Sequence, residues 1–142
     1  LFSDATKPYV NSLAYDQANH ILYYVTDGSS SSTAKNNQSL KKYDCLSGIS
    51  STVIADINNS PLNIPTMDLG VESAGAAFYN GSLYLGIEGG QYDNSNTRET
   101  IIYRIDFDAS LNPTGAVQVY ATPSYSGSSS IHDWGDFIIK TE

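Results

Sequence analysis

The sequence predicts an all-β fold, and three observations lead to this prediction. Strand-favouring residues are abundant, with 11 Tyr among 142 residues, whereas good helix formers cluster nowhere. Short runs of β-branched and aromatic residues alternate with clusters of Gly, Asn, Asp and Ser, which are typical of turns. The order of these runs then recurs, so the sequence predicts two four-stranded antiparallel units.

The first unit contains four predicted strands, separated by two tight turns and one long polar loop. The strands are residues 10–16, 20–26, 39–44 and 51–57. The loop, residues 28–38, contains four consecutive serines.

The second unit follows the same order. Its predicted strands are residues 75–79, 82–87, 100–107 and 116–121, with a polar loop at 88–99. Asn80 and Gly81 predict a two-residue type I′ hairpin, which needs positive φ at both central positions. Residues 134–139, after a loop at 123–131, are expected to form the first strand of a further unit.

The two units can be overlaid in three segments. Residues 22–25 (LYYV) match 83–86 (LYLG), residues 40–44 (LKKYD) match 102–106 (IYRID), and Ala14-Tyr15 matches Ala77-Phe78. A four-stranded unit of about 60 residues that occurs twice is typical of a propeller-like array. The fold class predicted is therefore all-β and β-propeller-like, with blades at 1–74 and 75–133 and a first strand of a further blade at 134–142.

The aligned residues also carry a family resemblance. Residues 13–16 (LAYD) followed by 21–27 (ILYYVTD) resemble a blade of the YWTD and NHL type of β-propeller, with Val25 where that motif has Trp. Residues 40–44, Gly48 and residues 52–54 are similar to the outer half of such a blade. The second unit departs further and ends its motif in Glu88. The resemblance implies that Asp27, and Glu88 by position, is a structural hydrogen-bonding residue.

Two blades cannot close a ring, because propellers typically have four to eight. Open strand edges invite pairing with other chains. We therefore expect either that blades are missing or that copies form a homo-oligomer through these edges, with residues 134–140 crossing to a neighbour. The alternative is one closed β-sandwich or small barrel of eight or nine strands.

Composition and charge exclude several classes of protein. The net charge of −8 argues against a nucleic-acid partner, which requires clustered Lys and Arg. A single Cys excludes a disulfide framework, and no apolar run is long enough for a membrane helix. Few charged residues and many Ser, Thr, Asn and Tyr suggest an extracellular, cell-surface or periplasmic location. Because the chain begins with Leu1, we expect a piece of a larger exported protein.

The long connections are expected at one face of the fold, which is where binding usually occurs. They are residues 27–38, 58–73, 88–99 and 122–133. Tyr92 and Tyr125 lie in these predicted loops and combine a stacking surface with a hydroxyl group, which suits saccharide or peptide recognition. Packing within the loop is the alternative role.

Acidic and aromatic residues on the same face complete the candidate ligand site. Asp27, Glu88 and Asp93 offer oxygen ligands for Ca²⁺, but their spacing matches no calcium loop, so no cofactor is expected and calcium remains the alternative. His132, Asp133 and Trp134 fit a sugar- or peptide-binding cleft in one interpretation. In the other interpretation Asp133 caps the loop and Trp134 packs between blades.

The sequence does not predict a catalytic site. Cys45 is expected to be a buried inert thiol, and His20 a surface residue beside a turn. Asp106 and Asp108 share a strand face and so resemble the carboxylate pair of a glycosidase, but they enter a turn, where a solvated edge is expected. We therefore expect a noncatalytic module that binds protein or carbohydrate through the long-loop face. The alternatives are part of a propeller-fold hydrolase, lyase or sugar dehydrogenase completed by missing blades or another subunit, and a purely structural scaffold.

Overall fold

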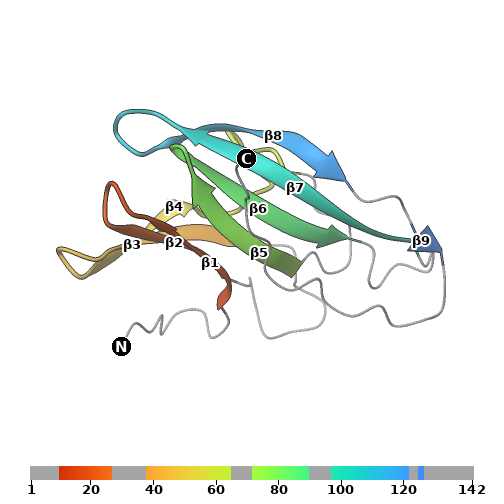
Figure 1. Ribbon diagram of the computed structural model, residues 1–142, viewed down its shortest axis with the longest axis horizontal. Helices are drawn as coiled ribbons and strands as arrows, with labels where there is room; N and C mark the ends of the chain where they lie inside the picture. The colour runs from red at the N-terminus through yellow and green to blue at the C-terminus, as the bar shows by residue number, and fades with distance from the viewer. Residues whose placement is uncertain (1–9, 27–37, 65–71, 90–96, 122–124, 127–142) are drawn as a thin grey trace.

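The computed structural model describes residues 10–26, 38–64, 72–89, 97–121 and 125–126 (Figure 1). They form two four-stranded antiparallel sheets in which each strand pairs with the next along the chain. The predicted all-β class and the two four-stranded units are thereby confirmed. Strand pairing stays within each sheet, so the described residues do not close a ring or a barrel. They include no helix that is long and apolar enough to cross a membrane.

Both sheets have the same meander order. Sheet A consists of β1 (Val10–Asp16), β2 (Ile21–Thr26), β3 (Ser39–Asp44) and β4 (Ile49–Ile54). Sheet B consists of β5 (Glu72–Tyr79), β6 (Ser82–Gly89), β7 (Thr97–Phe107) and β8 (Pro113–Ala121). A two-residue strand, β9 (Tyr125–Ser126), pairs with the first residues of β7.

Strand boundaries differ from the sequence prediction mainly in β4 and sheet B. The predicted fourth strand, residues 51–57, is instead β4 at 49–54, because the chain turns after it. The amide of Ile57 donates to the carbonyl of Gln38 at 2.9 Å, and the Asp56 carboxylate accepts from the amide of Asn58 at 3.0 Å. Strands β5, β7 and β8 begin earlier than predicted. The predicted strand at 134–139 lies outside the described residues.

The core lies between the two sheets, which approach most closely at β1 and β5 (Figure 1). Tyr23 of β2 is completely buried, and its ring stacks on Phe78 of β5 at 5.4 Å between centroids with planes 5° apart. Phe107 of β7 lies 5.0 Å from the same ring. Aliphatic side chains of both sheets surround this trio, chiefly Val25, Leu40, Leu83, Leu85, Ile87 and Ile105.

The segment after β4 fills the space between the sheets away from β1 and β5. Ile57, Leu62 and Ile64 are all at most 3% exposed and belong to the core. The carbonyl of Pro61 lies beside Gly115 of β8, where an added Cβ would be in ordinary van der Waals contact with it at 3.9 Å. This segment therefore adds three buried apolar side chains to the core.

The pairing registers of the two sheets correspond. Ala14 pairs with Tyr23 in sheet A, and Ala77 pairs with Tyr84 in sheet B, as the sequence alignment places them. Each first strand has an irregularity before that pair, between Val10 and Ser12 in β1 and between Ser73 and Gly75 in β5. The fourth strands have another, at Val53 in β4 opposite 40–41 and at Val119 in β8 opposite 102–103. Bulges re-aim a strand and increase its twist, so the two sheets bend at the same places.

The predicted hairpin at Asn80 and Gly81 is confirmed. Their φ values are 48° and 79°, positive at both positions as the type I′ turn requires. A Cβ at Gly81 would meet no atom within 4 Å, so backbone conformation alone restricts this position.

We expect Gly81→Ala to destabilise the chain by roughly 1–2 kcal/mol, the cost of left-handed backbone for a residue with a Cβ. Gly81→Asn should cost less, because Asn tolerates this conformation. Urea unfolding followed by circular dichroism measures both. Equal costs for the two variants would contradict the assignment to backbone strain.

Leu85 and Leu46 provide a matched test of the inter-sheet core. Leu85 is 0% exposed between the sheets, whereas Leu46 in the β3–β4 turn is 77% exposed. We expect Leu85→Ala to lower the free energy of unfolding by about 2–5 kcal/mol and Leu46→Ala to change it by less than about 0.5 kcal/mol. Urea titration of both variants tests this, and similar losses would place the core elsewhere.

Candidate functional site

The strand order separates the connections into two ends of the scaffold. Four short hairpins, at 16–21, 44–49, 79–82 and 107–113, lie together at the left in Figure 1. The connections from β2 to β3, from β4 to β5 and from β6 to β7 leave the sheets at the other end. This is the separation of short and long connections that the sequence predicts.

Most of the predicted ligand residues lie outside the described residues. These are Asp27, Tyr92, Asp93, His132, Asp133 and Trp134. Their predicted roles, including the calcium alternative, stay predictions.

Two predicted site residues can be placed by their backbone. Glu88 belongs to β6, near its end at the long connections, and pairs with Glu72 and Thr100. The backbone of Tyr125 belongs to β9 and pairs with Arg98 of β7, so the prediction that Tyr125 lies in a loop is wrong. The cause is that β7 begins at Thr97, earlier than predicted, and thus offers an edge to which Tyr125 and Ser126 can pair. The side chains of both residues lie outside the description.

At the hairpin end, three aspartates bind the backbone of their own turns. Asp16 accepts from the amides of Ala18 and Asn19 at 3.1 and 3.3 Å. Asp44 and Asp108 each accept from two amides at 2.8–3.1 Å, and these bonds lower the pKa of both carboxyl groups. Such bonds satisfy turn amides that would otherwise need water, so these carboxylates have structural roles.

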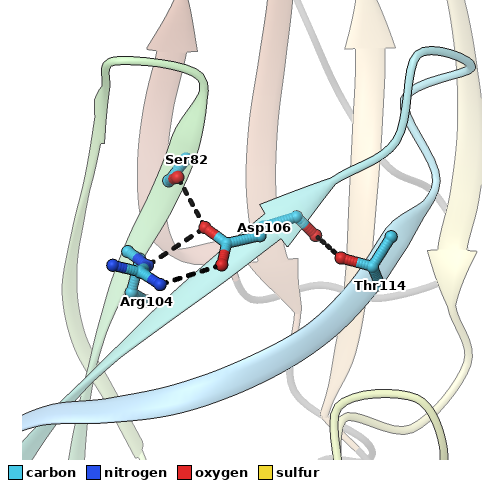
Figure 2. Close-up of polar contacts among 4 residues, drawn as sticks. All are labelled: Ser82, Arg104, Asp106 and Thr114. Carbon is cyan, nitrogen blue, oxygen red and sulfur yellow. Dashed lines mark hydrogen bonds and ion pairs between the residues drawn. The ribbon is translucent and has the colours of Figure 1, made fainter.

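Asp106 makes different contacts, which Figure 2 shows. Its carboxylate accepts the hydroxyl of Ser82 on β6 at 2.7 Å. The guanidinium of Arg104 binds the same carboxylate through Nε at 3.0 Å and Nη2 at 3.1 Å. Thr114 of β8 donates its hydroxyl to the Asp106 carbonyl at 3.1 Å. Asp108, and not Asp106, accepts the amides of the following turn, so the Asp106 carboxylate binds across the strands instead.

The electrostatics of this cluster do not favour acid–base chemistry. The Ser82 hydroxyl, and to a lesser extent Arg104, lower the pKa of Asp106 below its ordinary value. The side chains of Arg104 and Asp106 are 40% and 42% exposed, so water weakens their attraction. A general base works best with a pKa near the working pH, which this carboxyl group does not approach. The cluster therefore presents a fixed polar surface rather than a catalytic pair, and Asp108, turned to its own hairpin, does not complete a glycosidase dyad.

Two further sequence expectations concern single side chains. Cys45 is exposed, so the prediction of a buried thiol is wrong, because the residue falls in the β3–β4 turn rather than in a strand. His20 is exposed as expected, and its Nδ1 lies 3.1 Å from the Tyr15 hydroxyl. Within the described ranges no three His, Cys, Asp or Glu side chains are grouped so that they could hold a metal ion.

Sequence reasoning missed Ser82, Arg104 and Thr114. The Asn80-Gly81 turn fixes the pairing of Tyr79 with Ser82. It does not fix the register between β6 and β7, which brings Ser82 opposite Asp106, because a long connection separates these strands. The sequence contained one signal for Asp106, because Asp106 in the second unit aligns with Asp44 in the first.

No protein-family model, curated protein or solved structure matches this chain. Roles for its residues accordingly come from its own sequence and geometry.

We expect Ser82→Ala to raise the pKa of Asp106 toward the ordinary aspartate value, because the largest cause of its depression is removed. Carboxyl NMR titration measures it, with Asp108 as the internal control. A pKa that stays depressed in this variant would show that Ser82 is not the cause.

The lowered pKa of Asp106 also makes the stability of the fold depend on pH. A carboxyl group whose folded-state pKa is depressed stabilises the fold above its ordinary pKa of about 3.9, and this contribution is lost as the pH falls through the lower folded-state value. Below about pH 4 the wild type should therefore lose more stability than Asp106→Asn, relative to neutral pH. Parallel acid-dependence curves of the two chains would contradict this.

Proposed function

We propose that this chain is a noncatalytic binding module built from propeller-like blades of the YWTD and NHL type. It recognises protein or carbohydrate through the end that carries the long connections. The single observation that supports this is the separation of connections, with short hairpins at one end and long ones at the other. Long polar connections on a packed scaffold are where proteins usually place binding residues.

The described residues also support a noncatalytic role. The carboxylates at the hairpin end are engaged by turn amides or by Ser82 and Arg104. The connection of β4 to β5 begins with a well-packed segment, in which Ile57 and Ile64 are fully buried. This anchors the start of one long connection firmly on the scaffold.

Binding can be tested with glycan and peptide arrays on the wild-type chain. For a ligand found there, we expect Tyr92→Ala and Trp134→Ala to weaken binding by roughly tenfold or more, because each removes an aromatic contact surface. Isothermal titration calorimetry measures the affinities.

Tyr79→Ala is the matched control, since Tyr79 is an exposed tyrosine at the hairpin end. Its affinity should equal that of the wild type. Loss of binding in this control with retention in the other two variants would contradict the proposal, as would arrays without any ligand.

A further inference from the structure

The face of sheet B that points away from the core aligns, residue by residue, with the face of sheet A that is buried inside the molecule. This face, called here the second face of sheet B, includes Ala77, Ser82, Tyr84, Gly86 and Ile102, with Arg104 and Asp106 following Ile102 on β7. Tyr84 and Ile102 on it are partly exposed. None of these side chains belongs to the buried core.

In sheet A the aligned residues form the face that sheet B covers. They are Ala14, Ile21, Tyr23, Val25 and Leu40, with Lys42 and Asp44 following Leu40 on β3. The first five are at most 6% exposed. Tyr23 and Tyr84 occupy the same register position, each between an Ala on one neighbouring strand and a basic residue on the other. The second face of sheet B therefore repeats the Ala, the Tyr and the basic residue of the buried face, while Ser82 and Gly86 stand where sheet A has Ile21 and Val25.

The complementary surface is repeated in part, since the core residue Tyr103 of sheet B aligns with Lys41. Sheet B covers sheet A with a face that includes Ala76, Phe78, Leu83, Leu85 and Ile105. The aligned residues of sheet A form its second face and are Leu13, Tyr15, Leu22, Tyr24 and Tyr43. Leu13 and Tyr15, toward the hairpins, are 50% and 46% exposed. Tyr24 is buried, so the accessible part of this face is the part around Leu13 and Tyr15.

We infer that the second face of sheet B is a docking surface for a second copy of this chain, which seats its own sheet A there. The contact is heterologous: Tyr15 and Leu13 of one copy meet Tyr84 of the next, as Phe78 meets Tyr23 within the chain. Both halves of the contact exist on one chain, since the region around Leu13 and Tyr15 is exposed on sheet A and Tyr84 is partly exposed on sheet B, which is why a copy of the same chain is the partner. The inference is independent of ligand binding at the long connections.

The contact between copies is weaker than the contact within the chain. Phe107, the third ring around Tyr23, aligns with Cys45, so the contact between copies lacks one of the three rings. An aromatic pair contributes roughly 0.5–1.5 kcal/mol beyond the area it buries. Association is therefore expected to be reversible and dependent on concentration.

Two variants on opposite faces test the inference. Tyr15→Lys places a charge on the second face of sheet A, and Tyr84→Lys places one on the second face of sheet B. An unpaired charge in a dry contact is costly, so each variant alone should self-associate at least about tenfold more weakly than the wild type. Sedimentation equilibrium across micromolar concentrations measures this.

Mixing the two variants gives the decisive result. In the mixture one contact, between the intact sheet A of one chain and the intact sheet B of the other, is undamaged. A heterologous contact therefore predicts a 1:1 dimer that grows no further, whereas the wild type continues to larger rings or chains. No self-complementary contact or edge pairing predicts this pattern.

Leu46→Lys is the control, because it makes the same change of charge at an exposed turn outside both faces. It should associate like the wild type. Thermal melting of each variant establishes that it is folded, and Tyr84→Ala replaces Tyr84→Lys if the latter is not. A wild-type chain that stays monomeric throughout, or folded face variants that associate as the wild type does, would overturn the inference.

Discussion

The contact of Tyr23 with Phe78 and Phe107 is the interaction on which the arrangement of the two sheets depends. Tyr23 is completely buried, and its hydroxyl has no hydrogen-bond partner among the described residues. Burial, with the nearby Asp16 carboxylate, raises its pKa to about 12, so the ring stays neutral. An unsatisfied buried hydroxyl costs about 1–3 kcal/mol, which the packing of three rings and the surrounding aliphatic side chains must offset. Sheet A therefore has a preferred position on sheet B, because displacement would separate the rings and remove the packing that offsets the cost of the buried hydroxyl.

The strand order determines what lies at each end of the sheets. Because β1 to β4 and β5 to β8 are antiparallel and pair in chain order, every tight hairpin falls at one end and the long connections fall at the other. The aspartates of the hairpin end are occupied with turn amides, which stiffens that end without making it reactive. The corresponding bulges in β1 and β5, and in β4 and β8, bend both sheets alike. A sheet bent like its neighbour can be covered by another of the same shape.

The sequence predicts the strands well where period and turn chemistry agree. Residues 10–16 and 39–44 have the predicted limits, and Asn80-Gly81 forms its hairpin. Prediction fails where tertiary contacts decide. Ile57 has strand propensity, but it is drawn into the core through a turn held by Gln38 and Asp56. Cys45 follows a strand, but its turn leaves it in solvent. The Ser82 and Asp106 contact depends on a register across a long connection, which local pattern does not determine.

The layout of the second face of sheet B resembles an interface rather than an ordinary solvated face. Protein interfaces typically have an apolar centre and a polar rim that water reaches. Inside the chain, the covered face of sheet A has this layout, with buried Tyr23 at its centre and partly exposed Lys42 and Asp44 beside it on β3. The second face of sheet B has Tyr84 at the same central position and the Arg104–Asp106 ion pair beside it on β7, the strand that corresponds to β3. At a rim the pair stays hydrated, so covering the centre would not incur the large cost of burying it. A charged pair at the centre would oppose docking; at the rim it leaves the apolar centre available and fixes the orientation of whatever covers it.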